Sequence, residues 1–243
     1  MTSAVVSSLT SLAALEGVPS GFVAARDGID AMLRDRGLRR TAPETTAESL
    51  LRGAYASAVL EGSTSSLDEV RNGTGDEVSD DAVRVSTELL AWAPRLSRSP
   101  LQVLARLHTV AGARALDPER LGRPRDSESA ERLRTIAEAL AVGPEVPAMV
   151  VAAVAHAEIA VAAPFASHNG VVARAVERLV LVGRGVDEKS LVVPEAGHLA
   201  NRAAYESNLR AYRDGGSAGV HAWLLYAAEA YAAGAEASPV NDG

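Results

Sequence analysis

Apolar residues recur every three or four positions through most of the chain, which is the spacing of helices that bury one face. The first such run carries Phe22, Ile29 and Leu33. Further helical runs are predicted over about 46–60, 81–93, 100–115, 127–140, 147–163, from 169 onward, 197–213 and 218–233. The pattern predicts an all-α fold, a bundle of about eight or nine helices, with Val192 and Val193 as one short strand fragment.

Capping residues and the absence of a linker indicate the domain organisation. Thr45 or Thr46 can cap the second run, and Gly62 stands just past its end. Residues 1–18 are rich in Ser, Thr and Ala, and we expect them to form a flexible N-terminal arm. No Pro/Gly/Ser-rich stretch divides the remainder, so residues 19–243 are predicted to be a single helical domain.

Composition excludes several classes of protein. The net charge of −7 disfavours a general nucleic-acid binder, and the lack of cysteine excludes disulfides and thiolate metal sites. Residues 146–165 are long and apolar enough to suggest a membrane span, but His156 and Glu158 near the middle favour a buried core helix. Since no signal-peptide pattern is seen, we expect a cytoplasmic protein that binds neither nucleic acid nor membrane.

One segment between two apolar helices carries candidate chemistry. Asn169 and Gly170 stand at the start of a helix, where free backbone N–H groups and the helix dipole favour an anion. Gly170 allows close approach of the backbone to a phosphate, and Arg174 lies one turn further on, where it can bind phosphate bidentately. Taken alone, this pattern also fits an ordinary helix–loop–helix corner.

The spacing of this loop resembles the signature of Fic-domain proteins, whose active members transfer AMP from ATP to a protein hydroxyl. That signature reads His-Pro-Phe, two residues, Gly-Asn-Gly-Arg, two residues and Arg. Five residues of this chain match it in register: Pro164, Phe165, Asn169, Gly170 and Arg174. Further positions that resemble the family are Leu107, His108, Gly122, Arg125, His156, Asn201, Arg202, Tyr205, Leu209 and Trp223. The resemblance implies the helical Fic bundle.

A second motif resembles the inhibitory helix of the same family, here predicted near 46–62. Ser57 and Glu61 are followed by Gly62, which fits the family pattern of Ser/Thr, three residues, Glu, and then Gly or Asn. The two side chains are four residues apart and therefore share a helix face. The resemblance implies that Glu61 pairs with Arg174 and keeps the arginine away from the nucleotide. The alternative is an ordinary surface glutamate.

This chain departs from the signature at four positions. Ala163 stands where the family has its general base, and losing a positioned base costs about 10²–10⁴-fold in rate. Ser167 stands where the family often has a metal-binding acidic residue, His168 replaces the first glycine, and Val171 replaces the first arginine. The flap after Arg125, which docks the target peptide in the family, also looks curtailed.

We therefore predict a degenerate Fic-domain protein with little or no AMP-transfer activity. Ser167, His168, Asn169, Gly170 and Arg174 are the candidate nucleotide-binding residues, with ATP and magnesium as the candidate ligand. One alternative is an active transferase in which His168 supplies the base or another phosphate-containing donor is used. A third hypothesis is an interaction module with a vestigial loop, which binds an unknown protein or another copy of itself.

The other histidines are predicted to be structural. His108 and His156 have apolar neighbours and fit satisfied core residues, whereas His198 and His221 have no constellation around them in the sequence. No pair of histidines or carboxylates has metal-ligand spacing, so no metal site is predicted.

Overall fold

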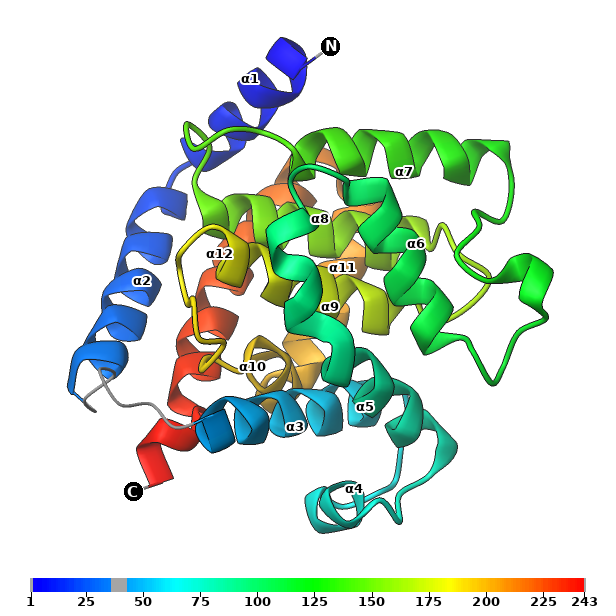
Figure 1. The fold of residues 1–243 in the computed structure, drawn as a ribbon. Coiled ribbons are helices and arrows are strands. Elements are labelled where there is room, and N and C mark those ends of the chain that lie inside the picture. Colours follow the sequence, from blue (N-terminus) through cyan, green and yellow to red (C-terminus); the bar gives the residue numbers. More distant parts are fainter. Residues whose placement is uncertain (1, 36–42, 243) are drawn as a thin grey trace.

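The computed structural model describes residues 2–35 and 43–242 of the 243-residue chain. Within these ranges it contains twelve α-helices and no β-strand (Figure 1). The helices are α1 (Thr2–Ala13), α2 (Val18–Asp35), α3 (Pro43–Leu60), α4 (Leu67–Asn72), α5 (Glu77–Leu89), α6 (Pro100–Ala111), α7 (Ser127–Leu140), α8 (Ala148–Ala162), α9 (Asn169–Gly183), α10 (Pro194–Ala200), α11 (Arg202–Asp214) and α12 (Gly216–Glu236). Short 3-10 helices cover Leu90–Arg95, Pro118–Arg120 and Pro239–Asp242. The predicted all-α class is confirmed, with more helices than the eight or nine expected.

Helices α8 and α9 form the centre of the bundle (Figure 1). Helix α8 is apolar on every side, and a helix of that kind is stable only when other elements surround it. It packs against α7, α9, α11 and α12, while α9 also contacts α5 and α6. The main hydrophobic core runs from Leu9 in α1 to Ala235 in α12. Among the described residues, none of the helices combines the length and apolar character needed to cross a bilayer.

The expected flexible arm over residues 1–18 is corrected by the structure, which has helix α1 there. Val5, Leu9 and Leu12 are spaced four and three residues apart and therefore lie on one helix face. Leu9 is buried, and the helix packs against α7 and α8. The many serines and threonines hide this short apolar stripe in the sequence.

The predicted run over 197–213 is also divided, because Asn201 leaves helical geometry at φ −113° and ψ 38° between α10 and α11. Val192 and Val193 do not form a strand. The Val193 N–H instead donates to the Gly234 carbonyl of α12 at 2.9 Å, and the Val192 N–H donates to Asp187 Oδ2 at 2.7 Å. These bonds satisfy the backbone without a strand partner.

Candidate functional site

The loop between α8 and α9 is held in one conformation by its own side chains. The Phe165 N–H donates to Asn169 Oδ1 at 2.9 Å, and Asn169 Nδ2 donates back to the Phe165 carbonyl at 3.0 Å. The Phe165 ring is buried and stacks on His108, with ring centroids 4.3 Å apart. Ala163 and His168 have φ values of 43° and 56°, a left-handed region that residues with a side chain rarely adopt. The loop is therefore rigid and locally strained.

Arg174, one turn into α9, is buried and fully engaged. Its Nε donates to Ser57 Oγ at 2.9 Å, and its Nη2 donates to the Ser57 carbonyl at 3.2 Å and to Glu61 Oε1 at 2.6 Å. Its Nη1 donates to the Tyr205 hydroxyl at 3.2 Å. Burial lowers the pKa of Arg174, but the contacts with Tyr205 and Glu61 raise it above its ordinary value. The arginine therefore remains charged while it is held by α3 and α11.

The Glu61 carboxylate lies against the first turn of α9. A Cβ added at Gly170 would overlap Glu61 Oε1 and would stand 3.2 Å from Arg174 Nη1. Glycine at this position therefore lets the carboxylate approach the helix N-terminus, where it interacts favourably with the dipole by about 0.3–1 kcal/mol. The structure thus brings together Ser57, Glu61, Gly170 and Arg174, and a carboxylate of the chain itself lies where the sequence predicts an anion.

Ser167 and His168 contact each other and a residue from α5. Ser167 Oγ lies 2.6 Å from His168 Nδ1, and His168 Nε2 lies 2.9 Å from Asp81 Oδ2. Asp81 is buried, and its other oxygen pairs with Arg84. The Ser167 hydroxyl is thus engaged by an imidazole, and no carboxylate stands at its position. Ser167 therefore does not fit the role of a magnesium ligand, since magnesium in a phosphate site prefers carboxylate oxygens.

Solved structures show which fold carries this loop. The structure of a Fic family protein from Desulfovibrio desulfuricans G20 matches with a TM-score of 0.74 at 17% identity, covering 91% of this chain and 74% of that chain. The chain has the Fic fold. Fic-1 from C. elegans, over its residues 134–508, matches with a TM-score of 0.65 at 19% identity, covering 90% of this chain and 71% of that chain. A Glu-to-Gly variant of Fic-1 matches with a TM-score of 0.67 at 18% identity, with coverages of 88% and 70%. No protein-family model and no curated protein matches the sequence.

In this Fic fold the flap side of the loop is occupied by the chain itself. Pro124 and Phe165 form an isolated antiparallel bridge, and the Arg125 N–H donates to the Pro164 carbonyl at 2.9 Å. Arg125 Nη2 also reaches the Ala162 carbonyl at 3.3 Å. These contacts tie the segment around Pro124 to the loop before α9.

His108 packs against Phe165 of the loop as a neutral ring. The Gly122 N–H donates to His108 Nδ1 at 2.9 Å, so this nitrogen must carry a lone pair. Burial, together with the smaller effect of the nearby His168, lowers the pKa of His108 to about 4. His108 is completely buried, as predicted, but its Nε2 has no hydrogen-bond partner, so the expectation of a fully satisfied core histidine is wrong.

A second polar cluster, which no motif in the sequence predicts, lies next to Arg174 in the core. His156 Nδ1 and His198 Nε2 each lie 2.9 Å from Glu177 Oε2, and the Tyr231 hydroxyl donates to Glu177 Oε1 at 2.9 Å. His156 Nε2 lies 2.9 Å from the Tyr205 hydroxyl, which connects the cluster to Arg174. The prediction that His198 has no polar partners is therefore wrong. The sequence did not indicate them because they come from helices far away along the chain.

Glu177 is the negative centre of this cluster. Burial alone would raise its pKa, but the facing rings of His156 and His198 hold it below its ordinary value. Among the described residues, His156, Glu177 and His198 form the group whose ligand atoms come close enough for a metal. The hydroxyls of Tyr205, Tyr226 and Tyr231 complete this cluster. The Tyr226 hydroxyl lies 3.0 Å from His198 Nδ1. The arrangement is thus a buried polar network around Glu177 that reaches Arg174 through the Tyr205 hydroxyl.

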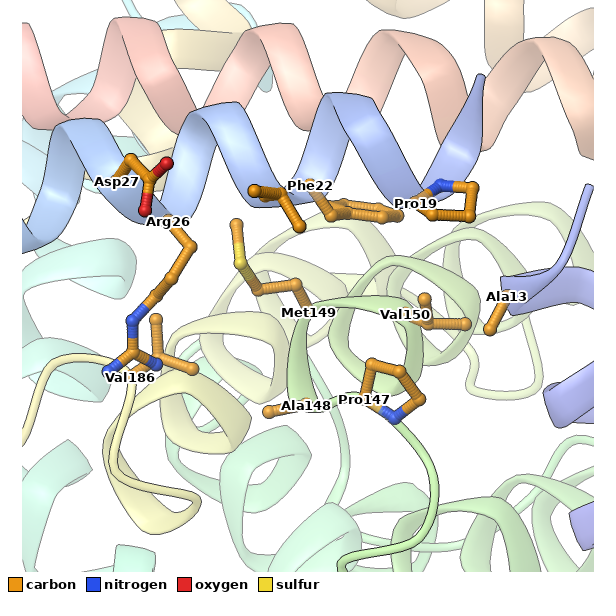
Figure 2. A pocket seen from close by; sticks show the side chains of 11 residues that line it. Ala13, Pro19, Phe22, Arg26, Asp27, Pro147, Ala148, Met149, Val150 and Val186 are labelled. Atoms are coloured by element: carbon orange, nitrogen blue, oxygen red, sulfur yellow. The ribbon is translucent and has the colours of Figure 1, made fainter. Parts of the chain in front are cut away.

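An apolar cavity lies at the other end of α8. The cavity has a volume of about 400 Å³. It is lined by Phe22 and Pro19 of α2 and by Pro147 and Met149 at the start of α8 (Figure 2). A 15-residue helix separates it from the loop, which corresponds to about 20 Å. Arg26 at its edge is paired with Asp30 at 2.9 Å, so the cavity offers little polar chemistry of its own.

Proposed function

We propose that this protein is a Fic-fold scaffold with little or no AMP-transfer activity, which binds a nucleotide or another phosphate-bearing ligand at the start of α9. The observation that carries the proposal is the ion pair between Arg174 and Glu61, with 2.6 Å between Nη2 and Oε1. Arg174 is the cation at this helix N-terminus that is placed to meet a phosphate. A ligand must therefore displace Glu61 before the arginine can bind it.

The loss of transfer activity is supported by Ala163. This residue ends α8 in a left-handed conformation and stands where the family signature has its general base. Its methyl group accepts no proton, and the loss of a positioned base typically lowers a rate by about 10²–10⁴-fold. Both ring nitrogens of His168 are engaged, by Ser167 and by Asp81, so His168 offers no free nitrogen to the hydroxyl of a target protein while Ser167 is bound to it.

Restraint of binding is supported by the partial exposure of Glu61. Its side chain is 32% exposed, whereas the Arg174 side chain is only 2% exposed. A ligand approaching from solvent therefore meets the carboxylate first. Because hydrogen bonds to charged groups contribute about 1.5–3 kcal/mol, and 1.4 kcal/mol is tenfold in affinity, removing Glu61 is expected to tighten phosphate binding by about tenfold or more.

The test is calorimetric titration of ATP, with and without magnesium, into wild type, Glu61→Gly, Glu61→Gln and Glu61→Gly/Arg174→Ala. We expect clearly tighter binding by Glu61→Gly, an intermediate effect of the isosteric Glu61→Gln, and loss of binding when Arg174 is also removed. Binding by none of the variants contradicts the ligand-binding part and favours a protein-interaction module.

A second assay follows transfer of radiolabelled AMP from ATP to proteins of a cell lysate. We expect no incorporation by wild type or by Glu61→Gly. Incorporation that disappears in Arg174→Ala would overturn the proposed loss of activity, since it would show that the altered site still performs the reaction.

A further inference from the structure

Asp81, His168 and Ser167 form a continuous hydrogen-bonded relay that ends at a partly exposed hydroxyl. The carboxylate of Asp81 and the imidazole of His168 are joined at 2.9 Å, and the imidazole and Ser167 Oγ at 2.6 Å. Asp81 is 7% exposed, and His168 has a side chain that is 16% exposed. Ser167 is partly buried in the loop, so the relay runs from a buried carboxylate to a partly buried serine.

The relay has a single direction of proton transfer. An ionised carboxylate only accepts hydrogen bonds, so His168 Nε2 must carry the proton that points at Asp81. In the neutral ring Nδ1 then has a lone pair, and the Ser167 hydroxyl must donate to it. This is the tautomer that a general base needs when it removes a proton from a serine, and such relays are recognised by geometry rather than by order in the sequence.

Two further features support the relay. Asp81 is fixed on both sides, because its second oxygen pairs with Arg84, so the carboxylate cannot rotate away from His168. His168 keeps a left-handed backbone at φ 56°, although residues with a side chain rarely adopt it. Backbone strain of this kind persists only where surrounding contacts enforce it, and it is concentrated at functional sites.

We propose that Ser167 is a nucleophile for acyl transfer from neutral carboxylic esters, with His168 as its general base and Asp81 as the residue that positions His168. Ser167 Oγ attacks the ester carbonyl carbon, and its proton passes to His168 Nδ1. The bond from the carbonyl carbon to the alkoxy oxygen then breaks, and the alcohol leaves with that proton. Water then attacks the carbonyl carbon while His168 Nδ1 takes one of its protons. The bond from that carbon to Ser167 Oγ breaks, His168 returns the proton to Oγ, and the acyl group leaves as a carboxylic acid.

The surroundings select neutral esters. The first turn of α9 follows directly after His168, and the reacting carbonyl would lie beside it. The carboxylates of Glu61 and Asp81 flank this turn and repel a substrate that carries its own negative charge. This activity needs neither nucleotide nor metal, so it stands independently of the phosphate-binding role.

The test uses p-nitrophenyl acetate as the ester and a fluorophosphonate probe as a covalent reporter, on the full chain. We expect hydrolysis by wild type, and labelling that peptide mass spectrometry locates on Ser167. Ser167→Ala and His168→Ala are each expected to lower the rate by about 10²-fold or more. Added imidazole is expected to restore part of the activity of His168→Ala only, which a purely structural role of His168 would not give.

Matched variants separate the relay from surface reactivity. Ser207→Ala and His221→Ala, which lie outside the relay, are expected to leave the rate unchanged. Asp81→Asn, which keeps the shape of the side chain, is expected to lose most of the activity, while Asp81→Glu retains more. Thermal unfolding of each variant shows that it is folded. Absence of hydrolysis in both wild type and Glu61→Gly, or labelling that persists in Ser167→Ala, overturns the proposal.

Discussion

Replacing Tyr205 by phenylalanine tests whether the buried network supports Arg174. The Tyr205 hydroxyl is the contact between Arg174 Nη1 at 3.2 Å and His156 Nε2 at 2.9 Å. All three side chains are buried, so water cannot replace the lost oxygen without opening the core. Tyr205→Phe keeps the ring and therefore removes only these two hydrogen bonds.

The expected cost follows from the groups left without a partner. A buried donor or acceptor that loses its hydrogen bond costs about 1–3 kcal/mol, and two such groups are affected here. We expect Tyr205→Phe to lower the free energy of unfolding by about 2–6 kcal/mol, measured by urea denaturation. Because about 1 kcal/mol corresponds to about 2–4 °C in a domain of this size, the midpoint of thermal unfolding should fall by about 4–24 °C.

Tyr212→Phe is the matched control. Its hydroxyl donates to Glu158 Oε1 at 2.8 Å, but Glu158 is partly exposed and also pairs with Arg132. Water can therefore satisfy the glutamate, and we expect a loss below about 1 kcal/mol. A Tyr205→Phe protein that is as stable as Tyr212→Phe would show that Arg174 and His156 do not depend on this hydroxyl, and the network argument would be refuted.

Two more predictions concern the loop. Gly170→Ala is expected to destabilise the wild type by about 1–3 kcal/mol, since its Cβ overlaps Glu61. In a Glu61→Gly background the same substitution is expected to be neutral or stabilising, because alanine there gains its helix propensity. A double-mutant cycle measured by urea denaturation that shows no coupling would contradict the contact. Burial lowers the pKa of His108 to about 4, against about 6.5 in the unfolded chain, so the unfolded state binds the extra proton first. The free energy of unfolding is therefore expected to fall as the pH falls from about 6.5 to about 4. His108→Phe should flatten the stability profile in that window, and an unchanged profile would show that another group titrates there.

Helical periodicity was sufficient to predict the fold class because most helices bury a regular apolar stripe. Helix α7 covers Ser127–Leu140, the same residues that the pattern indicates, and Asp126 caps it by accepting from the Ser129 N–H at 2.8 Å. The pattern failed where the stripe is short, as in α1, or where one irregular residue interrupts a run, as Asn201 does. A short stripe or a single irregular residue changes the average hydrophobic periodicity of a segment too little for the sequence pattern to indicate it.

The contacts of the candidate site were less predictable, because they join distant residues. Glu61 and Arg174 are 113 residues apart, and their pairing was expected only from the resemblance to Fic proteins. His168 and Asp81 are 87 residues apart, and no motif in the sequence connects them. One signal was available for the buried network. Glu177 and Arg178 stand next to each other in the mostly apolar helix α9, where charged residues require buried partners.

The buried contacts of Arg174 determine how strongly the removal of Glu61 is expected to raise the affinity for phosphate. Of the four hydrogen bonds that Arg174 donates, only one goes to Glu61, and the others go to Ser57 and Tyr205. When Glu61 is replaced by glycine, Nη2 loses one partner while the guanidinium stays fixed by the other three bonds. An incoming phosphate therefore finds a cation that is already oriented and pays little for ordering it. Tyr205→Phe in the Glu61→Gly background should consequently weaken ATP binding, because the freed arginine loses one of the contacts that orient it.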